Sequence, residues 1–596
     1  MQRDQGRVKA GTKVNGSRGI TVENGYLGLE TDRESLTFGG FVADCARRHG
    51  DREALVSGDR RITYEGLEAE VRQFAKALLA AGVAKGSTVA LMLGNRPEFV
   101  VAAFGAGSIG AIVVPVSTFA SAEERDYILR HSDASVLVTQ PSLLKHRFVD
   151  ELFESHPELA DGRPGQLRST AFPFLRRIVS RELSPPGAVD AWGFLVDRAE
   201  EIPDELLDAA MAEVHPRDPG IVIYTSGTSA HPKAVLHANG TPIIQSWRWA
   251  EALGLTDDDT VLSRFPYFWS GGFAMTLGGP LAAGATVVTA ESFTPEVVLE
   301  LVEREQVTVL QAMPHTYSEL VEHEDFAQRD LSSLSMAVGA EPLVAALPDR
   351  PWRAQANGYG LTETFTFCTW ADPEEVRDRY AGEFRTVHGR PLPGIDLRIV
   401  DAETGEPLPQ GELGEIAVKG ATFMLGYHKA YAEEYLDGNG YFRTGDTAHL
   451  DETGMLHWGG RVSNMIKTAG SNVSPVEIES KLSLWGQLKV AAVVPIPHPL
   501  LDEAVVLCAV PHHDDAVVAE DIVGHLKTVL ASYKVPKRVL IVDEHDLTHT
   551  SSGEKLKTTD LKCLAARLIA ADDGDWGSYL RTAHPELFAQ PEPAGT

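Results

Sequence analysis

Residues 221–234, IVIYTSGTSAHPKA, carry the strongest local signal in this chain. The apolar run at 221–224 predicts a buried strand that leads directly into a loop rich in hydroxyl side chains, with one glycine, one proline and then Lys233. Such a loop can direct backbone N–H groups, hydroxyls and one cation toward a polyphosphate. Its spacing is not GxxxxGK[ST], so it is not a Walker loop. Taken alone, the segment is also compatible with a polar surface turn.

Outward from this loop, helical patterns alternate with short apolar runs from about residue 36 to 460. The runs lie at residues 89–93, 111–114, 135–138, 221–224, 286–289 and 307–311. This alternation predicts largely parallel sheets covered by helices. Residues 397–400 and 415–418 predict a later antiparallel β region, and after Gly460-Arg461 shorter elements follow at 491–494, 505–510 and 539–542.

We therefore predict an α/β plus α+β architecture. Its large N-terminal domain consists of helix-covered sheets with a β subdomain, and its small C-terminal α+β domain is mobile. The predicted boundaries are a flexible N-terminal extension over 1–35, the large domain over 36–461, the small domain over 462–580 and a disordered tail over 581–596.

Composition limits the class of protein. Lys and Arg total 54 against 84 Asp and Glu, a net charge of −30 that repels nucleic-acid phosphates and predicts no nucleic-acid partner. The four cysteines, Cys45, Cys368, Cys508 and Cys563, have no CxxC spacing, which predicts neither a disulfide framework nor a zinc cluster and fits a cytoplasmic location. No secretory signal is expected at the N-terminus.

Three apolar or glycine-rich stretches resemble membrane spans or a dinucleotide-binding loop, but we interpret them as buried elements of the fold. Residues 99–122 and 265–290 are uncharged and long enough to span a bilayer, but their glycines and prolines favour buried elements, so no transmembrane segment is predicted. Residues 105–110, GAGSIG, match GxGxxG but lead into a strand-like run rather than a helix. We expect these glycines to serve close helix packing.

Several ordered segments together resemble the adenylate-forming superfamily, which comprises acyl-CoA synthetases, peptide-synthetase adenylation domains and beetle luciferases. Residues 221–234 resemble its YTSGTTGxPKG signature, residues 359–363 (YGLTE) its YGxTE motif, and residues 339–343 (GAEPL) its adenine-contact stretch. The later matches are TGD at 444–446, GR at 460–461, IK at 466–467, Gly470, PVEIE at 475–479 and YKVP at 533–536. The resemblance covers roughly residues 36 to 565 and implies an acyl-CoA ligase.

The resemblance also implies which residues hold the nucleotide. They are Thr225, Ser226, Gly227, Thr228, Ser229, Lys233, Gly339, Ala340, Glu341, Pro342, Tyr359, Gly360, Thr362, Asp446 and Arg461. Tyr359 is implied to stack on adenine, Asp446 and Arg461 to bind the ribose hydroxyls, and Thr362 to contact the α-phosphate. Glu363 is implied to hold Mg²⁺, an ion that proteins usually bind through one or two carboxylates plus phosphates. Without the resemblance, Glu363 is equally typical of a surface acid.

The implied reaction uses a small-molecule carboxylic acid, ATP and CoA. The carboxylate attacks the α-phosphorus of ATP to give an acyl-adenylate and pyrophosphate, a step that rests on positioning and electrostatic stabilisation. The small domain then rotates about a hinge at Ser463, which withdraws Lys555 and brings the loop at Gly470 inward. The CoA thiol attacks the carbonyl and AMP leaves. Lys555, Thr228, Glu363 and Gly470 are the implied catalytic residues.

The phosphate-type loop departs from the family pattern, because Ala230 and Ala234 stand where glycine is usual. A Cβ costs on the order of 1 to 3 kcal/mol if the backbone there needs a positive φ, and nothing if the conformation is ordinary.

Residues 549–557, HTSSGEKLK, stand where the family has the lysine motif PRTxSGKxxK, and they depart from it. Aligned on its glycine it places Glu554 at the lysine position, and aligned backward from Lys562 it places Lys555 there; we choose Lys555. The hinge pair Ser463-Asn464 replaces acidic residues. These departures predict that adenylation is weakened and that the chain mainly thioesterifies a preformed acyl-adenylate, made by a separate adenylating enzyme.

Residues 265–272, FPYFWSGG, lie where the family builds part of its acyl pocket. They contain no acid to pair with an amino group, which argues against an amino-acid substrate. Trp269, Ser270, Gly271 and Gly272 are the predicted pocket residues, with the glycines leaving room for a bulky hydrophobic acid, as in natural-product biosynthesis. Plain core packing of these aromatic side chains is the alternative.

Four other readings remain open at this stage. A fully competent two-step synthetase needs no impaired adenylation, and a carrier-loading adenylation domain would show a fused carrier module, which we do not find. An oxygenating luciferase shares the motifs and would release light or CO₂ without CoA. A non-catalytic adenylate-binding protein would bind nucleotide without turnover. The acid's identity and the oligomeric state are not predicted.

Overall fold

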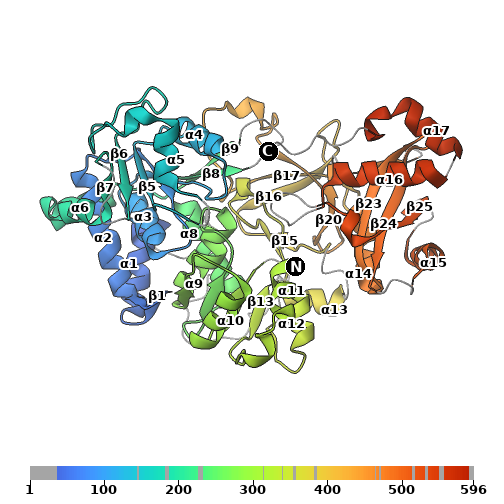
Figure 1. Cartoon of the computed structure of the whole chain (residues 1–596), viewed down its shortest axis with the longest axis horizontal. Helices are drawn as coiled ribbons and strands as arrows, with labels where there is room; N and C mark the ends of the chain where they lie inside the picture. The colour runs from blue at the N-terminus through green and yellow to red at the C-terminus, as the bar shows by residue number, and fades with distance from the viewer. Residues whose placement is uncertain are drawn as a thin grey trace, which may run out of the picture.

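The computed structural model describes residues 36–588 apart from 144–145, 182–186, 226–231, 313, 339, 354–356, 381–385, 463–464, 469–470, 513–516, 531–533, 549–555 and 573. The described chain forms a broad N-terminal body and a smaller C-terminal domain at one end of the long axis (Figure 1). The predicted N-terminal extension, residues 1–35, lies outside the described residues.

The loop-bearing strand of residues 219–225 belongs to an eight-stranded sheet. Its order is β18 (Gly426–Tyr427), β9 (Lys233–Ala238), β8 (Pro219–Thr225), β4 (Ile112–Pro115), β3 (Thr88–Met92), β5 (Val136–Thr139), β6 (Arg177–Ser180) and β7 (Asp190–Ala191). From β8 to β7 the strands are parallel, whereas β9 is antiparallel to both β8 and β18. The phosphate-type loop therefore connects two antiparallel neighbours.

A second, six-stranded sheet lies beside the first. Its order is β13 (Met336–Val338), β12 (Val309–Gln311), β10 (Thr260–Ser263), β11 (Thr286–Val288), β1 (Glu53–Ser57) and β2 (Arg60–Thr63). All neighbours are parallel except the β1–β2 hairpin. The predicted parallel, helix-covered sheets are confirmed.

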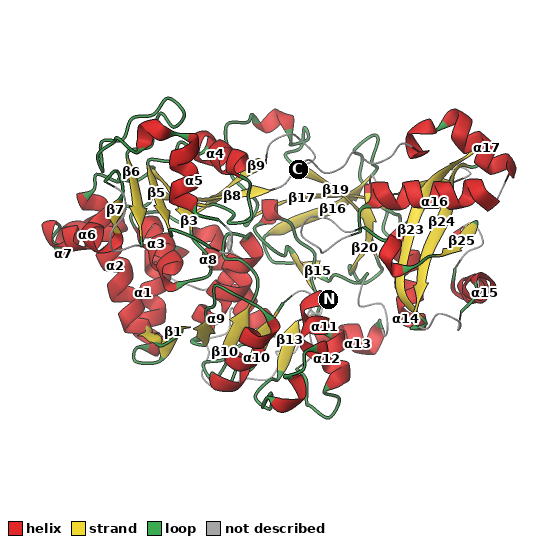
Figure 2. Cartoon of the chain, in the orientation of Figure 1, coloured by secondary structure: helices red, strands yellow, loops and turns green. Residues whose placement is uncertain are grey.

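Helices cover both sheets, as Figure 2 shows by secondary structure. They are α1 (Phe38–His49), α2 (Tyr64–Ala80), α3 (Pro97–Ser108), α4 (Ala122–His131), α5 (Phe148–Ser155), α6 (Trp192–Asp197), α7 (Asp204–Ala212), α8 (Gly240–Ala252), the π-helical η4 (Gly272–Gly278), α9 (Gly279–Ala283), α10 (Pro295–Arg304), α11 (Pro314–Glu322), α12 (Glu341–Ala346) and α13 (Pro373–Arg379). The largest cluster of buried apolar side chains joins α1, α2, α3 and α8 to strands of both sheets.

Helix α3 accounts for both the uncharged apolar stretch at 99–122 and the GxGxxG match at 105–110. Every residue of α3 is buried, and a Cβ on Gly107 would lie 2.5 Å from the Phe38 ring. A Cβ on Gly105 would lie 3.2 Å from the Val71 carbonyl oxygen. The glycines therefore allow close packing against α1 and α2, as expected, and the stretch is a short buried helix followed by β4.

The predicted antiparallel region is also present. A four-stranded sheet has the order β16 (Ile395–Val400), β17 (Gly414–Gly420), β19 (Phe442–Leu450) and β20 (Leu456–Arg461), all antiparallel, and β14 (Thr369–Trp370) pairs with β15 (Arg390–Pro391) nearby. Figure 1 shows this region between the N-terminal sheets and the C-terminal domain.

The C-terminal domain is built around one mixed sheet. It contains β22 (Ser471–Val473), β21 (Ile466–Thr468), β24 (Asp502–Pro511) and β23 (Leu488–His498), with β25 (Arg538–Ile541) parallel to β24. Alternate residues of β24 enter two cores: Val505 and Leu507 pack with α14 (Pro475–Trp485) and α15 (Ala519–Val529), whereas Val506 and Cys508 pack with α16 (Thr558–Asp572) and α17 (Gly574–Ala583). The predicted α+β fold is confirmed.

One boundary prediction is wrong. Residues 581–588, predicted to belong to a disordered tail, lie in described elements, because α17 continues to Ala583 and a 3₁₀ helix follows at Pro585–Phe588. Trp576 anchors this helix by donating a 2.7 Å hydrogen bond to the Pro497 carbonyl, and Leu580 is fully buried. Residues 589–596 lie outside the described part.

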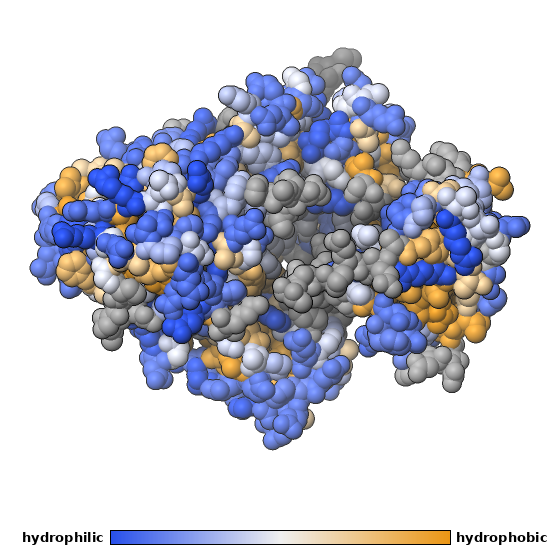
Figure 3. All heavy atoms as spheres, turned by 45° about the horizontal axis from the view of Figure 1, so that its top comes forward, coloured by the Kyte–Doolittle hydropathy of each residue, from blue (hydrophilic) through white to orange (hydrophobic). Residues whose placement is uncertain are grey.

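The surface is mainly polar on the face drawn in Figure 3, with hydrophobic side chains in separate patches. Among the described residues, no helix has the length and apolar character needed to cross a membrane. The four cysteines are all free thiols.

Candidate active site

The wall of the site that the nucleotide motifs predict is formed by Tyr359, Asp446 and Arg461. The Tyr359 hydroxyl donates a 2.6 Å hydrogen bond to Asp446 Oδ2, and Arg461 Nε lies 2.9 Å from Oδ1 of the same carboxylate. Asp446 and Arg461 are direct cross-strand partners in the β19–β20 hairpin, which explains how residues 15 positions apart meet. Burial raises the pKa of Asp446, and the Tyr359 hydrogen bond and the Arg461 charge act in the opposite direction.

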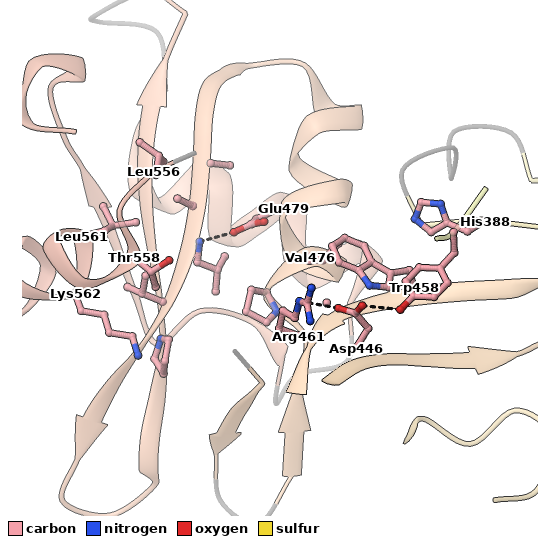
Figure 4. Close-up of a pocket in the computed structure, with 18 of the residues that line it drawn as sticks. His388, Asp446, Trp458, Arg461, Val476, Glu479, Leu556, Thr558, Leu561 and Lys562 are labelled. Atoms are coloured by element: carbon pink, nitrogen blue, oxygen red, sulfur yellow. Dashed lines mark hydrogen bonds and ion pairs between the residues drawn. The ribbon is translucent and has the colours of Figure 1, made fainter. Parts of the chain in front are cut away.

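This wall faces a cavity of about 600 Å³ between the two domains. The N-terminal side presents Tyr359, Asp446 and Arg461 together with His388 and Trp458, whose rings pack edge to face with centroids 5.8 Å apart. The C-terminal side presents α14, β23 and the start of α16, with Glu479, Leu556, Thr558, Leu561 and Lys562 (Figure 4). The volume lies in the range of small-molecule and cofactor sites. Leu556 directly follows the predicted catalytic residue Lys555, which lies outside the described residues.

Glu363, the predicted metal ligand, sits in a 3₁₀ turn at Thr362–Thr364. Its Oε1 accepts a 2.5 Å hydrogen bond from the hydroxyl of Tyr427 in β18. The Lys233 ammonium of β9 lies 5.2 Å from the centroid of the same tyrosine ring. Strand pairing β18–β9 thus brings the lysine and the carboxylate of two separate motifs to the same tyrosine, the lysine beside its ring and the carboxylate at its hydroxyl.

Two residues of this region were not predicted. His237 of β9 is fully buried, and its Nε2 lies 2.8 Å from the Thr362 carbonyl oxygen, so it fixes the turn that carries Glu363. Burial lowers its pKa to about 3, which keeps the imidazole neutral and makes Nε2–H the donor to the carbonyl. The sequence signal for His237 is weak, since a histidine in an apolar strand resembles an ordinary core residue. Tyr427 follows only from the β18–β9 pairing, which no local pattern reveals.

Ala234 of the phosphate-type loop has one of the two backbone conformations that the sequence leaves open. It lies inside β9, paired with Tyr224, and is 3% exposed. The described non-glycine residues with positive φ are Asp133, Gln306, Phe365 and Lys429, so Ala234 has an ordinary extended backbone. A glycine-like strain at this position is therefore ruled out.

Of the other residues predicted to bind nucleotide or to act in catalysis, the structure describes some and not others. Thr225 ends β8 and pairs with Lys233 of β9. Ala340 is buried directly before α12, and Pro342 lies in the first turn of that helix. Gly360 lines the cavity beside Tyr359. The remaining predicted residues lie outside the described part: Ser226, Gly227, Thr228, Ser229, Ala230, Gly339, Ser463, Gly470, Glu554, Lys555 and the side chain of Glu341.

The predicted acyl segment is only partly as expected. Trp269 is half-buried, and its ring packs edge to face on Phe268, while Ser270 is buried. A Cβ on Gly271 would meet no atom within 4 Å, consistent with open space. A Cβ on Gly272 would lie 1.8 Å from the Pro266 carbonyl oxygen. Gly272 therefore serves backbone packing rather than leaving room for substrate.

Comparisons with known proteins agree with this geometry. The AMP-binding enzyme family model matches residues 42–428, and the model of the AMP-binding enzyme C-terminal domain matches residues 477–554. A feruloyl-CoA synthase from Amycolatopsis sp is 31% identical over 522 residues, 86% of this chain and 96% of that protein. An indoleacetate–CoA ligase from Aromatoleum aromaticum is 30% identical, covering 87% of this chain and 96% of the relative.

The solved structure of the anthranilate CoA ligase AuaEII in complex with anthranoyl-AMP has a TM-score of 0.71 to this chain. It is 25% identical, and the match covers 90% of this chain and 98% of AuaEII. On the ordered motifs, the two matched domains and these relatives, the chain belongs to the adenylate-forming AMP-binding enzymes and, within them, to the acyl-CoA ligases.

Proposed function

We propose that this chain forms the CoA thioester of a bulky hydrophobic carboxylic acid through an acyl-adenylate. The observation that carries the proposal is the cavity in which Tyr359, Asp446 and Arg461 face the C-terminal domain. An adenosine bound at this wall is covered by the domain that must move between the two half-reactions. Attack of the carboxylate on ATP releases pyrophosphate, and attack of the CoA thiol on the adenylate releases AMP.

The substrate class is inferred from the acyl segment. Phe119 is 63% exposed and packs edge to face on Phe268, which in turn packs on Trp269. Aromatic side chains thus lead from the surface to the half-buried Trp269, and residues 265–272 carry no acid that could pair with an amino group. Two relatives are named for feruloyl and indoleacetate substrates, which supports a bulky acid.

Mg²⁺ is the metal that fits this site best. Glu363 uses one carboxylate oxygen for the Tyr427 hydrogen bond, and its other oxygen has no protein partner among the described residues. One carboxylate beside bound phosphates matches the usual way in which proteins hold Mg²⁺. When bound there, the ion neutralises phosphate charge during adenylation.

We also propose that adenylation is the weaker half-reaction and that a separate enzyme supplies the acyl-adenylate. With Ala234 in an ordinary conformation, this proposal rests on Ala230, on the acidic Glu554 beside Lys555 and on the altered hinge pair at Ser463. An acid next to the catalytic lysine opposes stabilisation of the charge that develops on the phosphates.

The test measures both half-reactions across a panel of bulky acids. The first assay follows pyrophosphate exchange with acid and ATP and then CoA thioester formation once CoA is added, and the second follows CoA thioester formation from chemically made acyl-adenylate. We expect thioester from both routes, with the second at least tenfold faster. Equal rates would contradict weakened adenylation, and the absence of thioester from both routes would contradict the proposed function.

A further inference from the structure

Gln311, the last residue of β12, holds a buried amide that lacks a partner. The side chain is fully buried, and neither its Oε1 nor its Nε2 has a hydrogen-bond partner within the described chain. A buried amide left unpaired destabilises the fold, so native structures nearly always satisfy such groups. A partner therefore has to come from outside the described part of the chain.

The other buried glutamines of the described chain are engaged. Gln245 of α8 donates through Nε2 to the carbonyl oxygens of Thr364 and Phe367, both at 3.0 Å. Gln140 accepts from the Gly94 N–H and donates to the Ser142 carbonyl. Gln245 lacks a partner at Oε1 only, so among the buried glutamines of the described chain Gln311 is the one whose amide is unpaired at both polar atoms.

The backbone around Gln311 is held firmly, so a loose strand does not explain the orphan amide. Its carbonyl accepts a 2.9 Å hydrogen bond from the Arg264 N–H. The buried Tyr317 hydroxyl accepts from the Ala312 N–H and donates to the Leu310 carbonyl, both at 3.0 Å. These bonds fix the strand end and leave only the amide without a partner.

The location of Gln311 points to the substrate. It lies at the carboxyl end of three parallel strands, with Ser263 of β10 and Val338 of β13 as its cross-strand neighbours. Beyond this edge, β10 leads into the acyl segment at 265–272 and β13 leads toward Ala340. Side-chain alternation puts Gln311 on the face of Val309, which packs with Met275 of η4. Open α/β sheets bind their ligands at this carboxyl edge.

We propose that Gln311 is a specificity-determining residue of the acyl pocket, whose amide hydrogen-bonds a hydroxyl, amino or carbonyl substituent on the hydrophobic part of the acid. This inference rests on the proposed function and narrows it: the substrate is a bulky acid with one polar substituent. The substrate carboxylate is not the partner, because it must reach the α-phosphate that Thr362 is implied to contact. A permanently bound water is the competing partner.

The test uses pairs of aromatic acids that differ only in one ring hydroxyl, amino or keto substituent. We expect wild-type kcat/KM to favour at least one substituted acid by about tenfold to a hundredfold over its unsubstituted partner, since sites built to hydrogen-bond a substrate group discriminate strongly. In Gln311→Leu this ratio falls at least tenfold, while the unsubstituted acid is used within about threefold of the wild-type rate. Gln311→Met, a second apolar variant, shows the same loss.

Thermal unfolding separates a specificity role of Gln311 from a purely structural one, because loss of a structural contact would lower the melting temperature. Gln311→Leu keeps or raises the melting temperature, because it removes an unpaired amide. The matched control Gln245→Leu lowers it, because the Thr364 and Phe367 carbonyls lose their donor.

Two outcomes would overturn the assignment while leaving the proposed function intact. One is an unchanged substrate ratio in both Gln311 variants, and the other is an equal loss for all acids with a lowered melting temperature, as expected for a structural water. Absence of thioester from every acid with the wild-type protein would contradict the proposed function itself, and the assignment with it.

Discussion

The hydroxyl of Tyr427 donates a 2.5 Å hydrogen bond to the Glu363 carboxylate, which accepts no other hydrogen bond from the described residues. The same ring lies beside the Lys233 ammonium and packs edge to face on Tyr435, with centroids 4.8 Å apart. Because a hydrogen bond to a charged group is stronger than a neutral one, this contact sets the direction in which the carboxylate points. We therefore expect Tyr427 to position Glu363, the proposed metal ligand.

Replacing Tyr427 with Phe should slow adenylation about tenfold, since loss of one charged hydrogen bond is worth roughly 1.4 kcal/mol or more. The ring contacts to Lys233 and Tyr435 remain. Pyrophosphate release measured against Mg²⁺ concentration should show a raised half-saturating Mg²⁺. Tyr435→Phe is the matched control and should leave both quantities unchanged; an unaltered Mg²⁺ dependence in Tyr427→Phe would contradict the assigned role.

Low pH should destabilise the fold because two histidines are buried in their neutral form. Burial lowers the pKa of His237 to about 3 and that of His388 to about 4, from an ordinary value of 6.5. Both imidazoles stay neutral in the folded state, whereas the unfolded chain binds protons below pH 6.5. Stability that is fully present above pH 6.5 is therefore lost as pH falls through 5, by roughly 2 kcal/mol for each histidine at pH 5.

Chemical denaturation of His237→Gln at pH 7.5 and pH 5 should show a smaller loss of unfolding free energy than wild type, by about 2 kcal/mol. His512, which is exposed, provides the control, and His512→Gln should lose as much as wild type. An identical loss in His237→Gln and wild type would show that this histidine is not held neutral.

At the scale of elements, the two adjacent glycines before and within η4 should behave in opposite ways. Gly271 has ordinary helical angles, φ −62° and ψ −46°, and a Cβ there meets nothing within 4 Å. A Cβ on Gly272 collides with the Pro266 carbonyl oxygen at 1.8 Å. The turn from β10 into η4 therefore tolerates a side chain at one position only.

Gly271→Ala should leave the melting temperature unchanged or slightly raised, because alanine favours helical backbone by up to about 1 kcal/mol. Gly272→Ala should be destabilised by about 1 to 3 kcal/mol or fail to accumulate as folded protein. Differential scanning fluorimetry of both variants makes the comparison. Equal stability of the two would refute the packing role of Gly272.

Elements were easier to predict from sequence than their contacts. Apolar runs such as residues 221–224 and 505–510 reveal strands because burial selects Val, Ile and Leu locally. The contrast between Gly271 and Gly272, the ordinary conformation of Ala234 and the orphan amide of Gln311 depend on contacts that exist only in the folded chain. Pro266 and Tyr224 decide the first two, and no local pattern distinguishes Gln311 from a polar strand end.

At the scale of the whole molecule, the candidate site forms only where two domains meet. Strand β20 ends at Arg461 and β21 of the C-terminal sheet begins at Ile466, so a few residues connect the wall of Tyr359, Asp446 and Arg461 to the domain on the other side of the cavity. The cavity combines Arg461 and Lys562 with Asp446 and Glu479. Its local charge is thus balanced, which explains how a chain with a net charge of −30 can bind ATP and CoA.

The central claim is that the acid passes through an acyl-adenylate on its way to CoA. It is tested most directly by supplying a bulky acid labelled with ¹⁸O in its carboxylate, together with ATP, Mg²⁺ and CoA, and by mass spectrometry of the products. The account predicts AMP carrying one labelled oxygen and a thioester that retains the other. Unlabelled AMP, or ADP and phosphate in place of AMP and pyrophosphate, would contradict it.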